Sequence, residues 1–151
     1  MTQNNLNIDL QKLQSESVNN GGIWSFIELP SLDEENINEY FKSISKEVKI
    51  ESIFNENTKE LIIDSIDYWS AFSGPCPEHS ENTIHYNKLK ETFMNNHFQF
   101  INKNGIIDIY RVEHLDSWLK RVIETGIDHM NENIIFQTEN SLFLLHLGFS
   151  S

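Results

Sequence analysis

The chain has 151 residues, with 11 Lys or Arg against 23 Asp or Glu, so its formal net charge is −12 and its pI is about 4.8. This charge argues against a nucleic-acid-binding protein, because affinity for phosphates comes from clustered basic residues. The same charge disfavours binding to anionic membrane surfaces.

The length predicts one domain over residues 1–151, in which residues 1–20 form an N-terminal helix that is either integral or loosely attached. A single cysteine, Cys76, rules out an intrachain disulfide and is typical of a reducing compartment. The N-terminus lacks a signal-peptide pattern, and no apolar run approaches the ~20 residues needed to span a bilayer. We therefore expect a soluble cytoplasmic protein.

Hydrophobic spacing and turn residues predict helices and strands that alternate along the chain. The clearest helix start is Ser31, which has the spacing of a capping box with Glu34. Together these elements predict an α+β fold, a single compact domain with a mainly antiparallel sheet and packed helices. In chain order we expect helices over 6–13, 31–48, 59–72, 81–95 and 115–123, and strands over 23–29, 49–54, 98–103, 106–112, 133–138 and 141–147.

Two of these segments depend on local signals that allow more than one interpretation. Residues 59–72 form either a helix with an acidic outer stripe or, over 59–66, a strand paired with the preceding one, and we favour the helix. Asn104 and Gly105 favour a type I′ turn, which predicts a β-hairpin from the strands on either side of them.

The segment with the most reactive side chains contains Cys76 and His79, with His85 close behind. A nucleophilic cysteine needs a nearby base, and the same three side chains are metal-ligand types. However, no cysteine-enzyme signature, paired C-x-x-C or H-E-x-x-H is present, so we expect an ordinary loop cysteine and no catalytic, metal or cofactor site. His146 alternates with Leu144 and is expected to be a strand-face or core residue.

The negative charge is concentrated in the first half of the chain, with a net −6 in residues 1–40 and −3 in residues 41–80. Solubility alone accounts for such a surface, but it also suits a basic partner, because opposite fields accelerate association. The expected partner-binding residues are four acidic side chains and two aromatic candidates for an anchor: Glu56, Glu60, Asp64, Asp67, Tyr68 and Trp69.

The leading functional hypothesis is a small acidic binding protein, not an enzyme, of the immunity or antitoxin type that neutralises a basic protein partner, with a nuclease toxin as one candidate. The chain is similar to bacterial immunity proteins in size and charge, an analogy that covers no motif. Two alternatives stay open. One is a small enzyme or a ligand- or metal-binding protein with a site near Cys76, His79 and His85, and the other is a homo-oligomeric accessory subunit.

Overall fold

The computed structural model describes residues 1–19, 21–30, 37–44, 48–72, 84–113 and 130–149. The helices are α1 (Gln3–Ser15), α2 (Ile37–Ile44), α3 (Thr58–Ser70) and α4 (Ile84–Lys103). The strands are β1 (Ser25–Leu29), β2 (Lys49–Ser52), β3 (Ile106–Glu113), β4 (Met130–Thr138) and β5 (Leu142–Phe149). The helix start at Ser31, the loop around Cys76 and the helix over 115–123 lie outside the described residues.

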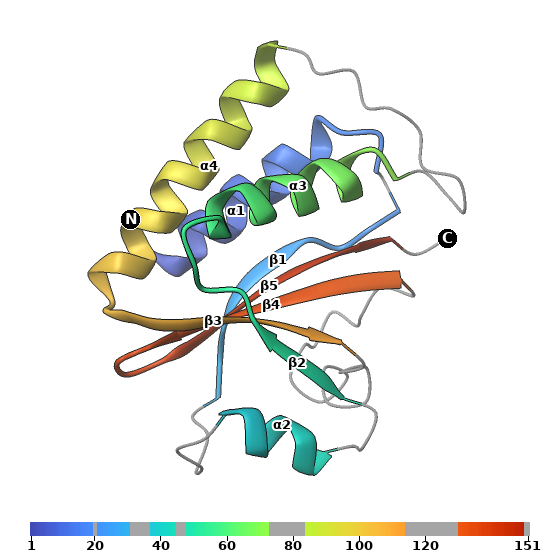
Figure 1. Ribbon diagram of the computed structural model, residues 1–151. Coiled ribbons are helices and arrows are strands. Elements are labelled where there is room, and N and C mark those ends of the chain that lie inside the picture. The colour runs from blue at the N-terminus through green and yellow to red at the C-terminus, as the bar shows by residue number, and fades with distance from the viewer. Residues whose placement is uncertain (20, 31–36, 45–47, 73–83, 114–129, 150–151) are drawn as a thin grey trace.

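The five strands form one antiparallel sheet in the order β1-β5-β4-β3-β2 (Figure 1). The last strand, β5, lies between β1 and β4, where Ser25 pairs with His146 on one side and Phe136 pairs with Phe143 on the other. Some neighbours in the sheet, such as β4 and β5, are therefore consecutive in the chain. Others, β1 and β5, come from opposite ends of it. The predicted α+β class with an antiparallel sheet is confirmed.

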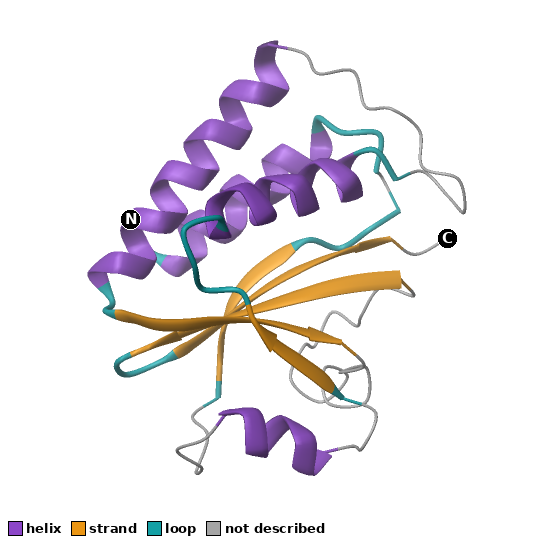
Figure 2. Ribbon diagram, in the orientation of Figure 1, coloured by secondary structure: helices purple, strands orange, loops and turns teal. Residues whose placement is uncertain are grey.

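Helices cover both faces of this sheet. Figure 2 shows α1, α3 and α4 on one face and α2 on the other. The alternation of side chains along β5 follows from this arrangement, since Phe143 and Leu145 join the cluster under the three helices while Leu142 and Leu144 join the cluster that includes α2. All eight residues of β5 are buried, as expected for a strand covered on both faces.

The N-terminal helix α1 forms one wall of the larger core. Its leucines at positions 6, 10 and 13 are fully buried, so the predicted helix over 6–13 is confirmed. The Asn7 side chain accepts a hydrogen bond of 2.8 Å from the backbone N–H of Phe26 in β1. Because β1 is an edge strand, this contact occupies a backbone donor that an edge otherwise exposes.

The β-hairpin predicted around Asn104 and Gly105 is wrong. Residues 98–103 continue α4, and Gly105 ends the helix with φ +75°, the left-handed conformation of a helix C-cap. The backbone N–H of Asn104 bonds to the carbonyl oxygen of Phe100 at 3.1 Å, as in a helical turn. The buried residues of α4 recur at helical spacing up to its last turn: Tyr86, Phe93, Met94, His97 and Ile101.

The helix interpretation of residues 59–72 is confirmed as α3, and the strands predicted at 23–29, 49–54, 106–112, 133–138 and 141–147 are present with shifted ends. None of the described helices is long and apolar enough to cross a membrane.

Two of the described histidines lie in the core. His97 is fully buried against Phe26 and Phe136, whose ring centroids lie 4.8 and 4.7 Å from its own, and this burial lowers its pKa to about 3. Neither of its ring nitrogens has a hydrogen-bond partner among the described residues. His146 is also fully buried, with Nδ1 2.7 Å from Oδ1 of Asn133, which confirms the prediction that it is a core residue.

Candidate protein-interaction surface

The direction of α3 is set by Thr58 at its first residue. Its hydroxyl donates a hydrogen bond of 2.6 Å to the carbonyl oxygen of Ile53 and accepts one of 2.9 Å from the N–H of Asn55. Short polar side chains at a helix start commonly satisfy backbone groups in this way. These bonds fix the turn that leads from β2 into α3.

The inner side of α3 is held to the sheet by Glu132 of β4. Its carboxylate accepts hydrogen bonds from Ser65 Oγ at 2.7 Å, Trp69 Nε1 at 2.9 Å and Arg111 Nε at 3.0 Å. We call these four side chains the Glu132 cluster. Hydrogen bonds to charged groups are stronger than neutral ones, so this cluster fixes the rotation of α3 about its own axis.

A second set of contacts joins α3 to α4. The Asp67 carboxylate accepts a hydrogen bond of 2.9 Å from the Tyr86 hydroxyl, and Lys90 Nζ lies 2.8 and 3.2 Å from its two oxygens. Burial raises the pKa of Tyr86 above its usual range, so its hydroxyl stays protonated and remains a donor. Helix α3 is therefore held on two sides, by the sheet and by α4.

The outer side of α3 carries an exposed acidic stripe. We define the acidic stripe as Glu60, Asp64 and Tyr68, which follow one another on α3 at intervals of four residues, together with Glu56 in the turn before the helix. Spacing of four residues places side chains on the same helix face. The three carboxylates are exposed and make no ion pair within the part of the chain that the structure describes.

Tyr68 closes the acidic stripe with an exposed aromatic ring. The side chain is 49% exposed, and its ring meets that of Trp69 edge-on, with centroids 5.1 Å apart and planes at 90°. The ring also lies 6.0 Å from that of Phe72. Tyr68 is thus both accessible and supported from beneath by the core.

The structure separates the six residues expected to bind a partner. Glu60, Asp64 and Tyr68 lie together on the outer side of α3, and Glu56 is exposed in the turn before this helix. In contrast, Asp67 is engaged by Lys90, and Trp69 is only 6% exposed. An aromatic anchor for a partner must be accessible, whereas Trp69 packs within the core.

The sequence interpretation missed the Glu132 cluster, which joins residues more than 60 positions apart. Its one local signal is the spacing of Ser65 and Trp69, which places both on the same helix face. No pattern in the sequence indicates that Glu132 of β4 lies opposite them.

The alternative site near Cys76 falls largely outside the described residues, which include only His85 of its three members. His85 is exposed, and its Nε2 lies 3.5 Å from the Glu16 carboxylate. Within the described ranges, no group of three or more His, Cys, Asp or Glu side chains is arranged to hold a metal ion.

No protein family, curated protein or solved structure gives a match to this chain. The fold alone therefore defines the class of this chain, which is an α+β protein with helices on both faces of an antiparallel sheet.

Proposed function

We propose that the protein is an inhibitor of the immunity or antitoxin type, which binds a basic protein partner through the acidic stripe on α3. The observation that carries this proposal is the line of three exposed carboxylates without ion pairs among the described residues, followed by an exposed tyrosine. A nuclease suits this surface, because carboxylates meet the basic groove that such an enzyme uses for phosphates.

Electrostatics supports this function through the rate of association. The net charge of −12 attracts a basic protein at long range, and the unpaired carboxylates of Glu60 and Asp64 give that attraction a defined location. Complementary fields raise association rates by roughly tenfold to a thousandfold at low salt. The complex is therefore expected to form more slowly as salt concentration increases.

Tyr68 supports the proposed function because an exposed tyrosine strengthens the contact with a protein partner. Tyrosine is enriched among residues that dominate binding energy, because one ring buries a large apolar area and its hydroxyl still forms a hydrogen bond. Its packing on Trp69 and Phe72 limits its motion before binding, which lowers the entropic cost of association.

The proposal is tested with the products of the genes on either side of the chain's own gene, with kinetics measured by surface plasmon resonance at two salt concentrations. The variant Glu60→Gln/Asp64→Asn removes two charges of the acidic stripe and is expected to lower the association rate constant about tenfold at low salt. The matched control is Glu51→Gln/Glu113→Gln, two exposed carboxylates on β2 and β3, which is expected to change the rate much less. Equal effects of the two variants contradict the assignment of the surface to α3.

A second pair of variants tests the anchor. Tyr68→Ala is expected to raise the dissociation rate constant at least about tenfold. Phe54→Ala is the matched control, because Phe54 is 47% exposed but lies outside the acidic stripe. If no basic protein binds, or if salt has no effect on binding, the proposed function is wrong.

The two other functions, a site near Cys76, His79 and His85 and a homo-oligomeric accessory subunit, remain predictions from the sequence. Fast alkylation of Cys76 at neutral pH supports the first, and sedimentation equilibrium distinguishes the second.

A further inference from the structure

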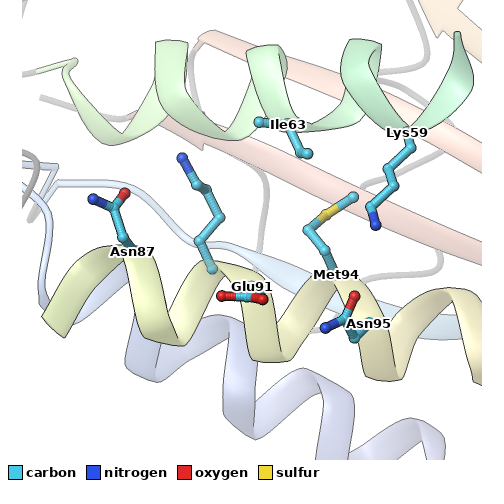
Figure 3. Close-up of a pocket in the computed structure, with 7 residues that line it drawn as sticks. Lys59, Ile63, Asn87, Glu91, Met94 and Asn95 are labelled. Atoms are coloured by element: carbon cyan, nitrogen blue, oxygen red, sulfur yellow. The ribbon is translucent and has the colours of Figure 1, made fainter. Parts of the chain in front are cut away.

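A groove of about 290 Å³ runs between α3 and α4. Figure 3 shows its lining side chains, with Lys59 and Ile63 on α3 and with Asn87, Glu91, Met94 and Asn95 on α4. Pockets for drug-sized ligands range from about 300 to 1,000 Å³, so this groove suits a smaller molecule. It lies beside the acidic stripe but shares no residue with it.

The floor of the groove is apolar. Met94 is 1% exposed, and Ile63 packs against the same core from the opposite helix. A methionine side chain is flexible and adapts to apolar groups of different shapes. This floor therefore favours an aliphatic or thioether side chain as the apolar part of a ligand.

Two charges around the groove, one cation and one anion, have no ion-pair partner among the described residues. Lys90 also lines the groove, but its ammonium is bound to Asp67. Lys59 on one wall and Glu91 on the other make no ion pair with any described residue. In Figure 3, Lys59 extends from α3 into the space above Met94.

We propose that this groove binds a free apolar α-amino acid in its zwitterionic form. The carboxylate faces Lys59, the ammonium faces Glu91, and the side chain lies on Ile63 and Met94. The ligand and the groove match in the number and sign of their charges, because the groove has one charge of each sign without an ion pair to a described residue, and an apolar floor. A peptide or a simple fatty acid does not carry both charges beside one short apolar group.

This inference is independent of the proposed inhibitor function, because Lys59 and Glu91 are outside the acidic stripe. The two are tested on different residues with different probes, so failure of one is distinguishable from failure of the other.

The test titrates L-leucine into the full chain and follows the Met94 methyl signal by NMR, with the signal assigned from the Met94→Leu variant. A ligand of this size is expected to bind with a Kd of about 1 mM. Three probes each lack part of the zwitterion: 4-methylpentanoate, isopentylamine and N-acetyl-leucinamide. Each is expected to bind at least about tenfold more weakly, since each lacks a charge-assisted hydrogen bond.

Variants then locate the two charges. Lys59→Gln and Glu91→Gln are each expected to weaken leucine binding about tenfold, and both sites are exposed, so the fold is retained. Lys12→Gln on α1 and Glu51→Gln on β2 are the matched controls and are expected to have no effect. The exchange variant Lys59→Glu/Glu91→Lys is expected to recover part of the lost affinity.

Three results overturn the proposal. One is the absence of any Met94 shift at leucine concentrations about tenfold above the expected Kd. Another is equal binding of N-acetyl-leucinamide and leucine, which indicates an apolar notch without charge recognition. The last is unchanged affinity in both Lys59→Gln and Glu91→Gln.

Discussion

The indole Nε1 of Trp69 donates a hydrogen bond of 2.9 Å to Oε1 of Glu132, which lies 63 residues further along the chain. This bond connects the buried side of α3 to the middle of the sheet. The same Trp69 ring supports the exposed ring of Tyr68. The surface proposed to bind a partner is therefore positioned by a contact within the core.

The first prediction concerns Glu132. Glu132→Gln replaces a carboxylate that accepts three hydrogen bonds with an amide, and it leaves the half-buried Arg111 without its partner charge. We expect a loss of about 1–3 kcal/mol in the free energy of unfolding, measured by urea denaturation. Glu113→Gln, at an exposed position on β3, is the control and is expected to change it by less than about 0.5 kcal/mol.

The second prediction separates the neighbours Tyr68 and Trp69. Trp69→Ala opens a cavity in the core and is expected to lower the free energy of unfolding by about 3–5 kcal/mol. Tyr68→Ala removes an exposed ring and is expected to cost less than about 1 kcal/mol. Thermal unfolding of both variants measures the difference. Similar losses in the two variants indicate that Tyr68 is a structural residue instead of a surface contact.

The third prediction is a pH dependence caused by His97. Its pKa in the folded protein, about 3, lies below the ordinary value of 6.5, so the unfolded chain binds the proton more readily between these pH values. The contribution of His97 to the free energy of unfolding therefore has its full value above pH 6.5. It is lost as the pH falls towards 3, by up to about 1.4 kcal/mol per pH unit.

The measurement for His97 is urea denaturation of the wild type and of His97→Met at pH 7 and pH 5. Methionine fills the space without titrating, so the wild type is expected to lose about 2 kcal/mol more than the variant over this range. Identical pH dependence in wild type and His97→Met is the contrary result.

The fourth prediction concerns Gly105 at the end of α4. A Cβ at this position lies 2.7 Å from Cδ of Glu139, and the backbone φ of +75° is unfavourable for a residue with a side chain. Gly105→Ala is expected to lower the free energy of unfolding by about 1–2 kcal/mol.

The double variant Gly105→Ala/Glu139→Ala separates the two causes at this turn. It relieves the side-chain contact but retains the backbone strain, so most of the loss is expected to persist in differential scanning calorimetry. If the double variant recovers full stability, the loss in Gly105→Ala comes from the contact with Glu139 and not from the backbone conformation of Gly105.

Periodic segments of the sequence were sufficient to predict most of the fold. The leucines of α1 have helical spacing, and the short, nearly continuous apolar run of β5 is typical of a strand buried on both faces. The error at Asn104 and Gly105 has a physical cause, because a glycine with positive φ ends a helix as readily as it forms a hairpin turn. Packing of the preceding His97 and Ile101 into the core decides in favour of the helix.

The candidate surface was predicted in part. Helical spacing was enough to place Glu60 and Asp64 on one face, because they lie on one element, but it assigned Tyr68 to the apolar face. The burial of Trp69 and the pairing of Asp67 with Lys90 depend on how α3 packs against β4 and α4. The groove between α3 and α4 is likewise a product of tertiary packing, and no local spacing indicates it.

The position of β5 has a consequence for the order of events during synthesis. Because β5 lies between β1 and β4, the edge strand β1 stays separate from the other strands until the ribosome has released residues 142–149. Until then β1 has no strand to pair with, and its apolar side chains have no partner in β5. Pairing of β1 therefore waits for β5, the last of the described strands to be synthesised.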